Sequence, residues 1–375
     1  MYYIENYMNS HPNWREKFAA APCFIKVKED GDYILLQYSQ LESDFSNEMV
    51  QQARGIILRL DTNSKSEWVC VCRPFNKFHN IQEDLAAPID WATASVQEKV
   101  DGSLMKVWYD LGKWHLSTNG CVDAFKAMIG DTDVSFGDIF LRAAGVRSVN
   151  EFAARFDPDY TYLFELTSPE TRLVIPYDDG VYFLAKKRTF TGAEVIATLS
   201  EMPPSVKYPR LYPIDEPDSA IKAASAMTQD EEGFVVVDEN LNRVKIKSLA
   251  WLEAHRAYNN GCVSTRTLID FIREEKIDDL LALAPTYKDK VEDIKLFLSQ
   301  YEEDLEWAWW IFDAWHKYHT YANEAMVADA INQTKHPDFV FKKLKRNMSS
   351  HDYIYKYLKT CTLVDIYKKW KEKMV

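Results

Sequence analysis

Residues 95–122 read SVQEKVDGSLMKVWYDLGKWHLSTNGCV, and this stretch decides the fold class. Apolar, β-branched and aromatic residues form short runs in it, separated by the pairs Asp101-Gly102, Leu111-Gly112 and Asn119-Gly120. Such pairs favour tight hairpin turns, because glycine and asparagine adopt positive φ at low cost. The sequence therefore predicts a β-meander over residues 95–122.

Similar runs flank this stretch on both sides, and each predicts a strand. They are YILLQYS, IILRL, WVCVC, YTYLFELT, RLVIPY, VYFLAKK, GFVVVD and RVKIKS. Helices are expected around DAFKAMIG, residues 123–130, and VNEFAARF, residues 149–156. Because no helix follows each strand in turn, the pattern predicts an antiparallel α+β domain and not a doubly wound sheet.

The C-terminal part differs in composition. All 12 glycines lie at or before Gly261, and the tail repeats apolar residues at i, i+3 and i+4 spacing. That spacing is typical of amphipathic helices, so we predict a first domain over 1–250 and an all-helical domain over 251–375. Four tryptophans lie in the tail, and core packing is the favoured interpretation over a base-stacking platform: Trp307, Trp309, Trp310 and Trp315.

Charge and cysteine content narrow the class of protein. The net charge is −12 and the pI is near 5.3, which argues against a surface that grips nucleic acid everywhere but not against a basic groove. A lysine-rich C-terminus remains either a solvated helix face or an RNA contact. The 6 cysteines lack metal-site spacing, so reduced thiols are expected. With no leader-like start and no apolar run of about 20 residues, we expect a cytoplasmic protein away from membranes.

Lys99 ends one predicted strand, and Asp101-Gly102 follows it within EKVDGSL, residues 98–104. No Walker loop or GxGxxG motif occurs, so nucleotide chemistry would have to use side chains. Taken alone, K-x-D-G is a common pattern, and a plain hairpin with a solvent-facing lysine explains it equally well. Its meaning depends on the segments that accompany it.

Over essentially its whole length the chain resembles the covalent nucleotidyltransferase superfamily of ATP-dependent ligases and capping enzymes. It is most similar to the bacteriophage-type RNA ligases that reseal broken tRNA. The segments that carry the resemblance are QQARGIIL with Arg54, RPFNKFHN with Lys77, EKVDGSL with Lys99, LFELTSPETRLVIPY with Glu165, EEGFVVV with Glu232, and RVKIKS with Lys245 and Lys247. The resemblance implies a ligase-type nucleotidyltransferase domain ahead of a helical substrate-specificity domain.

The resemblance also implies residue roles. The catalytic set is Lys99, Asp101, Lys245 and Lys247; the ATP-binding set contains Tyr38, Arg54, Lys77, Lys99, Glu165, Glu232, Lys245 and Lys247; the metal set is Glu165, Glu232 and Asp278. Alternatives stay open at three of these positions, since Tyr38 also suits a core, Asp101 a turn and Asp278 an exposed helix end. ATP is the implied co-substrate and Mg²⁺ the implied metal, with Mn²⁺ as a substitute.

General chemistry supports such a cationic cluster. Only on the order of one free lysine in a few thousand is a neutral, nucleophilic amine at pH 7. Neighbouring cations favour that form and also neutralise a triphosphate. In RVKIKS, Lys245 and Lys247 share a face with Arg243, whereas Arg54 is in phase with the apolar residues of its strand and needs a buried anion, from a ligand or from a structural carboxylate.

The expected activity is ATP-dependent joining of RNA 5′-phosphate and 3′-hydroxyl ends through lysyl-AMP and RNA-adenylate, with a role in tRNA repair. No protein partner is predicted, and a viral enzyme would act in the host cytoplasm. Asn119 departs from the tRNA-repairing relatives, which carry a lysine there, and this puts a phosphate contact in doubt. The alternatives are a DNA ligase, a capping enzyme or a non-catalytic RNA-binding module. A glycine-free helical tail disfavours the first two, which usually continue into a β-rich domain.

Overall fold

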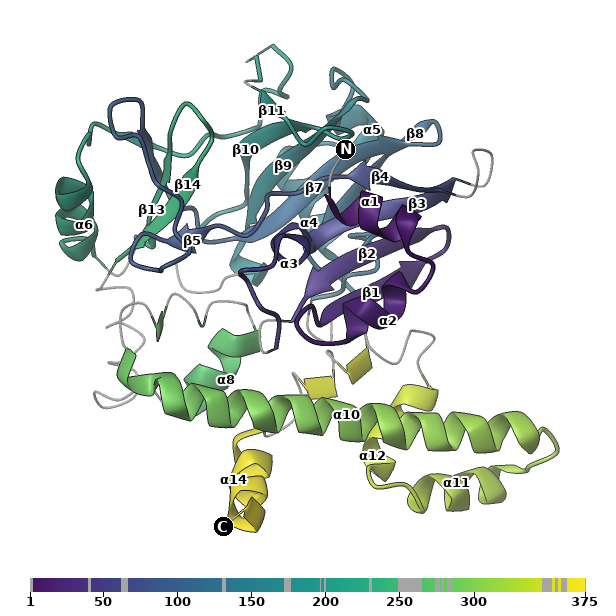
Figure 1. The fold of residues 1–375 in the computed structure, drawn as a ribbon. Coiled ribbons are helices and arrows are strands. Elements are labelled where there is room, and N and C mark those ends of the chain that lie inside the picture. Colours follow the sequence, from purple (N-terminus) through teal and green to yellow (C-terminus); the bar gives the residue numbers. More distant parts are fainter. Residues whose placement is uncertain are drawn as a thin grey trace. The chain divides into compact units, whose positions relative to one another are not determined.

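A computed structural model describes most of the chain, which divides into two compact units, 1–261 and 262–375 (Figure 1). The described residues are 3–39, 42–61, 67–129, 133–171, 177–195, 197–198, 200–228, 231–248, 265–273, 277, 280–281, 285–345, 353–354, 357–358 and 363–374. The predicted domain boundary at 250 lies outside them and stays a prediction. Residues 172–176 of the predicted strand RLVIPY also lie outside.

The first unit contains three sheets. The N-terminal sheet has the order β1-β2-β3-β4, the β9 sheet the order β11-β10-β9-β7-β8, and the β13 sheet the order β12-β6-β13-β14-β5. Neighbouring strands are antiparallel except for the β14 and β5 pair. The bounds are β1 Ile25–Asp30, β2 Tyr33–Tyr38, β3 Arg54–Asp61, β4 Glu67–Cys72, β5 His79–Asn80, β6 Ser95–Glu98, β7 Ser103–Asp110, β8 Lys113–Thr118, β9 Tyr160–Thr167, β10 Gly180–Arg188, β11 Glu194–Val195, β12 Leu211–Tyr212, β13 Gly233–Val237 and β14 Arg243–Lys247. The antiparallel α+β prediction is confirmed.

Short helices cover one face of each sheet. Helices α1 (Tyr3–Ser10), α2 (Trp14–Ala19) and α3 (Glu48–Gln52) share an apolar core with the N-terminal sheet. Helices α4 (Phe136–Ala144) and α5 (Val149–Phe152) pack on the β9 sheet, and α6 (Pro217–Ser225) packs on the β13 sheet. The opposite face of the N-terminal sheet packs against the β9 sheet, since Leu35 and Ile57 share a buried core with Trp108 on β7.

The predicted meander over residues 95–122 is wrong at its first turn. Strand β6 pairs with β12 and β13, whereas β7 pairs with β8 and β9, so Asp101-Gly102 carries the chain between two sheets. A Cβ at Gly102 would lie 2.4 Å from the Leu166 carbonyl oxygen, so glycine is required there by close approach to β9. The β7 and β8 hairpin is confirmed, with φ of 48° at Leu111 and 85° at Gly112.

The helix expected at 123–130 is also wrong. Residues 124–126 form a turn instead, and the Asp123 carboxylate accepts a hydrogen bond from the Phe125 amide at 3.0 Å. The helix begins at Phe136, where Ser135 and Asp138 form a reciprocal capping box, and it ends before Gly145 at φ 68°. Local capping chemistry therefore outweighs the apolar spacing of DAFKAMIG. The other expected helix, around 149–156, is confirmed as the shorter α5.

The described part of the second unit is helical. Its helices are α8 Thr265–Arg273, α10 Lys288–Tyr318, α11 Glu324–Asn332, α12 Pro337–Leu344 and α14 Leu363–Met374. Core packing is wrong for two of the tryptophans on α10, since Trp307 and Trp310 are each 58% exposed and stack on each other with centroids 4.8 Å apart. No helix within the described ranges is long and apolar enough to cross a membrane.

Candidate active site

Lys99 lies where the chain leaves β6. Its backbone amide donates to the Gly233 carbonyl at 2.9 Å, which fixes Lys99 against the start of β13. Its Nζ lies 2.8 Å from Oε2 of Glu232, and the Lys99 side chain is 20% exposed whereas that of Glu232 is 0% exposed. The predicted nucleophile is thus held at a buried carboxylate and remains open to solvent.

Lys247 reaches the same carboxylate from β14. Its Nζ donates to Oε1 of Glu232 at 2.6 Å, and its side chain is 2% exposed. This arrangement depends on Gly233, which has a φ of 135° and whose Cβ would lie 2.2 Å from the Ile246 carbonyl oxygen. Three residues that the sequence analysis took from separate motifs therefore form one cluster: Lys99, Glu232 and Lys247.

A bulge in β3 reorients Arg54. Leu36 pairs with Ile56 but Gln37 pairs with Arg54, so Gly55 is the extra residue and the alternation reverses there. The expectation that Arg54 shares the face of Ile56 is therefore wrong, because the sequence pattern does not register the bulge. The Arg54 guanidinium lies 5.3 Å from the Phe78 ring, and its Nη1 is buried without a hydrogen-bond partner among the described residues.

The segment RPFNKFHN carries aromatic rings and a lysine between the sheets. Lys245 Nζ lies 5.9 Å from the ring of Phe78, the ring that Arg54 also contacts. Lys77 Nζ lies 4.0 Å from the Phe45 ring and 5.6 Å from that of Tyr38. Arg54 and Lys245 thus both lie near the Phe78 ring, and Lys77 and Tyr38 both lie near the Phe45 ring.

Tyr38 is only 4% exposed and belongs to the core of the N-terminal sheet, where its ring packs edge-on against Phe45 at 5.1 Å.

Arg243 does not join the group of cations near Phe78, although the sequence places it on one face with Lys245. Its guanidinium binds the Glu194 carboxylate, with Nη1 and Oε2 2.8 Å apart, and so ties β14 to β11.

Glu165 lies in the middle of the β9 sheet, in register with Leu104 on β7 and Tyr182 on β10. Its Cγ lies 3.0 Å from the position of a Cβ at Gly102, so it adjoins the K-x-D-G segment, and Asp101 is buried at 4% exposure. Asp278 lies outside the described residues. Within the described ranges, no three metal-ligating side chains come together.

Lys106 is a functional candidate that the sequence analysis missed. It is fully buried, burial lowers its pKa to about 8, and its Nζ donates to the Gly55 carbonyl at the bulge. Asn119 also lies close to Gly55: its main-chain and side-chain oxygens are 2.4 and 2.9 Å from the position that a Cβ at Gly55 would take. The available signal was that Lys106 is in phase with Leu104 and Trp108 on β7.

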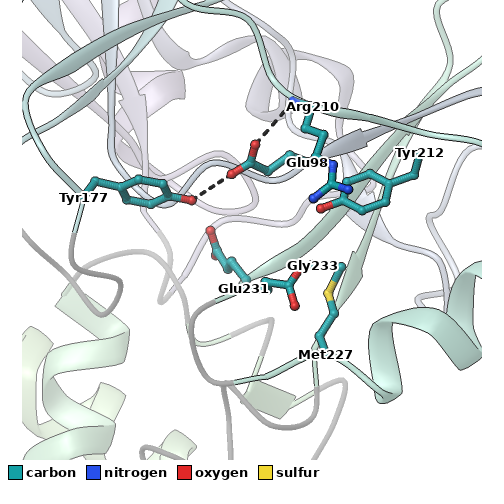
Figure 2. A pocket seen from close by; sticks show the side chains of 8 residues that line it. Glu98, Tyr177, Arg210, Tyr212, Met227, Glu231 and Gly233 are labelled. Carbon is teal, nitrogen blue, oxygen red and sulfur yellow. Dashed lines mark hydrogen bonds between the residues drawn. The ribbon is translucent and has the colours of Figure 1, made fainter.

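A cavity of about 260 Å³ opens beside Glu232 (Figure 2). Its lining residues are Glu98, Tyr177, Arg210, Tyr212, Met227, Glu231, Glu232 and Gly233. The Glu98 carboxylate accepts from the Tyr177 hydroxyl at 3.0 Å and from the Arg210 amide at 3.3 Å. Burial and the Glu98 charge raise the pKa of Tyr177, which therefore stays a donor.

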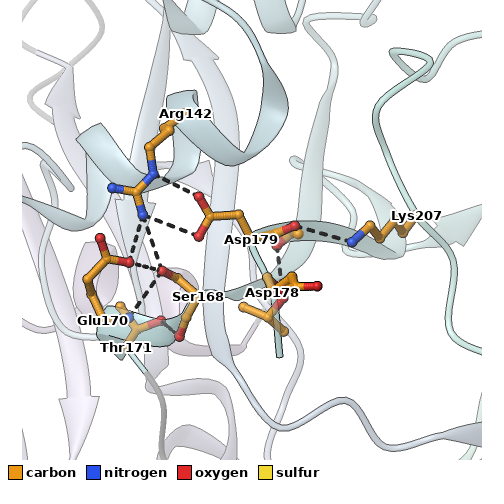
Figure 3. A network of polar contacts seen from close by, with 9 residues as sticks. Arg142, Ser168, Glu170, Thr171, Asp178, Asp179 and Lys207 are labelled. Carbon is orange, nitrogen blue, oxygen red and sulfur yellow. Dashed lines mark hydrogen bonds and ion pairs between the residues drawn. The ribbon is translucent and has the colours of Figure 1, made fainter. Parts of the chain in front are cut away.

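A polar network fixes the chain on both sides of residues 172–176 (Figure 3). Arg142 on α4 binds Glu170 and Asp179, each at 2.7 Å, and Lys207 donates to the Asp179 carbonyl at 3.2 Å. The hydrogen bonds from Arg142 and Ser168 hold the pKa of Glu170 at about 2. The network therefore anchors the end of β9 to the start of β10, next to Tyr177.

A model of the RNA ligase family matches residues 52–252, more than half of the 375-residue chain. The chain belongs to the RNA ligase family. The matched range contains all the positions that carried the resemblance: Arg54, Lys77, Lys99, Glu165, Glu232, Lys245 and Lys247.

Two relatives and one solved structure are similar to this chain. The chain is 32% identical over 289 residues to a putative bifunctional polynucleotide kinase/RNA ligase of Autographa californica nuclear polyhedrosis virus, an alignment that covers 72% of this chain and 40% of that protein. It is 23% identical over 346 residues to an RNA ligase of Rhodothermus phage RM378, covering 75% and 76%. A solved archaeal ATP-dependent RNA ligase is similar over 66% of this chain and 64% of its own, with 17% identity and a TM-score of 0.42.

Proposed function

We propose that this protein is an ATP-dependent RNA ligase that carries AMP on Lys99. The observation that supports it most directly is the cluster in which Lys99 and Lys247 share the buried carboxylate of Glu232. A partly exposed lysine with a second lysine beside it fits covalent nucleotide transfer, because the amine can reach a phosphate whose charge the second cation helps to neutralise.

The cations around Phe78 fit a triphosphate. Arg54 has a buried Nη1 with no hydrogen-bond partner in the described part of the chain, and a buried guanidinium of this kind calls for an anion. Lys245 contacts the same ring. Arg54 and Lys245 would bind the phosphates of ATP, and Lys77 and Tyr38 would lie beside its nucleoside.

A divalent metal fits less completely. The proposed ligands are Glu165, which adjoins Gly102, and Glu232, which is ion-paired with Lys99, and Mg²⁺ typically takes one or two carboxylates and completes its shell with phosphate oxygens and water. Mn²⁺ is an alternative for the same ligands, and Asp278 remains a proposed further ligand. The metal would supply charge neutralisation at the attacked phosphate.

Three balanced steps follow from these roles. The neutral Lys99 amine forms a P–N bond to the α-phosphorus of ATP, the bond to pyrophosphate breaks, and the amine proton is lost to solvent. An RNA 5′-phosphate oxygen then attacks the same phosphorus, and the P–N bond breaks as the amine regains a proton. Finally the RNA 3′-oxygen bonds to the 5′-phosphorus, AMP leaves, and the hydroxyl proton is released.

Repair of broken tRNA in the cytoplasm is the setting we propose. A capping enzyme would use the same lysine chemistry with GTP, a DNA ligase would use it on DNA, and a non-catalytic RNA-binding module would not use it at all. The intact Lys99, Glu232 and Lys247 cluster disfavours the last of these, and the helical second unit disfavours the first two.

The test is covalent labelling with α-³²P-labelled ATP or GTP and Mg²⁺, followed by denaturing electrophoresis. We expect label from ATP on the wild type and on Lys113→Ala, which removes an exposed lysine from the β8 hairpin, and none on Lys99→Ala. Preference for GTP would indicate capping. Absence of label on folded wild type would refute the ligase proposal.

A further inference from the structure

The cavity beside Glu232 extends from the cluster of Lys99 and Lys247 to Glu98, which lies on the face of the β13 sheet opposite to that of Lys245. Glu98 on β6 pairs with Phe234 on β13, so the two side chains share a face, and the Phe234 ring packs against Tyr212 with centroids 4.8 Å apart. Lys245 pairs with Val235 and lies on the other face. ATP bound over Phe78 would therefore leave this cavity open for a second ligand.

The lining of the cavity selects the chemistry of that ligand. Glu98 and Glu231 place two carboxylates around it beside the guanidinium of Arg210, whereas the carboxylate of Glu232 is ion-paired with Lys99 and Lys247. Carboxylates accept hydrogen bonds from hydroxyl groups such as those of a ribose. The Arg210 guanidinium lies 5.0 Å from the Tyr212 ring, and such an arginine and aromatic pair offers a surface on which a nucleobase stacks.

The chain that leads into the cavity suits an RNA strand. Residues 207–212 read KYPRLY and contain two basic residues, Lys207 and Arg210, among aromatic and apolar ones. Tyr208 is 44% exposed and Leu211 65% exposed on edge strand β12 and its approach, and Lys207 lies beside them. An RNA strand docked there would meet Lys207 along its backbone and the carboxylates at its terminal nucleoside.

We propose that the cavity binds the 3′-terminal nucleoside of the acceptor RNA, with its base against Arg210 and Tyr212 and its ribose hydroxyls toward the glutamates. This inference rests on the proposed ligase function and names the RNA end that the site recognises. Glu232 and Gly233 line the cavity and also contact Lys99, so the bound 3′-hydroxyl lies next to the residue that carries AMP. In the sealing step this 3′-oxygen bonds to the 5′-phosphorus of the adenylated RNA, AMP leaves, and the hydroxyl proton is released.

The test isolates sealing by supplying a 5′-adenylated RNA donor without ATP and varying the acceptor concentration. Arg210→Ala keeps the hydrogen bond from the Glu98 amide to the carbonyl of residue 210 and the one from the amide of residue 210 to the Glu98 carboxylate, so the local backbone contacts are retained. We expect it to raise the KM for acceptor about 10-fold with kcat near wild type, as for loss of one stacked base. Arg147→Ala, which removes an exposed arginine between α4 and α5, should leave both constants unchanged.

A second substrate makes the test specific. An acceptor whose 3′-terminal nucleotide lacks its base should raise the KM for wild type by a similar factor and for Arg210→Ala only slightly, because both changes remove the same contact. An unchanged acceptor KM in Arg210→Ala, or a rise in donor KM instead, would overturn the inference. Parallel loss of Lys99 labelling would assign the cavity to ATP. Wild type that neither labels nor seals would refute the ligase function itself.

Discussion

The carboxylate of Glu232 lies 2.8 Å from the amine of Lys99, and none of the Glu232 side chain is exposed. The same carboxylate neutralises Lys247, which is also buried. Removing Glu232 therefore does more than change the proposed nucleophile's partner, because it leaves a second, buried cation without its anion. The stability and the chemistry of this site are linked through one side chain.

Glu232→Gln should destabilise the protein by about 3 kcal/mol, since loss of one member of a buried pair leaves an uncompensated charge. Replacing both partners, as Glu232→Gln with Lys247→Met, should recover most of that stability without restoring Lys99 labelling. Urea unfolding followed by circular dichroism measures the first effect and covalent labelling the second. Strictly additive losses in the double variant would show that the two side chains do not act as a pair.

Gly55 and Gly112 offer a matched comparison, because their φ values are 81° and 85° but only Gly55 is crowded. Gly112→Ala should cost about 1 kcal/mol from backbone strain alone. Gly55→Ala adds contact with the Asn119 carbonyl oxygen and should cost roughly 1–3 kcal/mol more, with loss of labelling because the bulge aims Arg54. Thermal unfolding of both variants checks the difference, and equal losses would contradict the role of Asn119.

Lys245 and Arg243 are two positions apart on β14 but have different partners. Lys245→Ala should lower the labelling rate on the order of 10²-fold with little change in Tm, because it removes a cation that we propose binds the phosphates of ATP. Arg243→Ala should lower the free energy of unfolding by about 2 kcal/mol, because the ion pair with Glu194 is lost, while labelling at low temperature stays near wild type. The reverse assignment of the two effects would place Arg243 in the ATP site.

Local patterns were sufficient to locate most strands, whereas the residues of the cluster were predicted from the resemblance to a known family. Alternation predicted β7, β8, β9, β13 and β14, and the K-x-D-G segment lies at a strand end as expected. The same patterns do not encode which strands become neighbours. Asp101-Gly102 resembles a hairpin turn in sequence, yet it joins two sheets because β6 finds its partner in β13, far along the chain.

The misplaced side chains have the same physical origin. Arg54 changes face because one extra residue, Gly55, enters the ladder, and Arg243 is withdrawn by a glutamate 49 positions away. The cavity at Glu98 combines residues from four separate segments, so no single stretch of sequence predicts it. Long-range pairing, and not local propensity, decides these features.

Lys106 gives a prediction about pH. Its pKa is about 8 in the folded protein, because burial disfavours the cation, against about 10.4 in an unfolded chain. Between these values the unfolded chain binds a proton that the folded protein does not, so stability rises with pH over roughly 8 to 10.4. Below pH 8 the buried cation destabilises the fold in full, by about 3 kcal/mol.

Lys106→Met removes this titration, so the stability of wild type relative to the variant should increase by up to about 3 kcal/mol between pH 7 and pH 10. Lys187, whose pKa burial also lowers to about 8, is present in both proteins and cancels in the comparison. Urea unfolding across this pH range provides the measurement, with Lys113→Met, at an exposed position, as the control that should run parallel to wild type. Parallel curves for Lys106→Met would mean that Lys106 keeps its proton in the fold, and its contact with the Gly55 carbonyl would then be that of a stabilised buried cation.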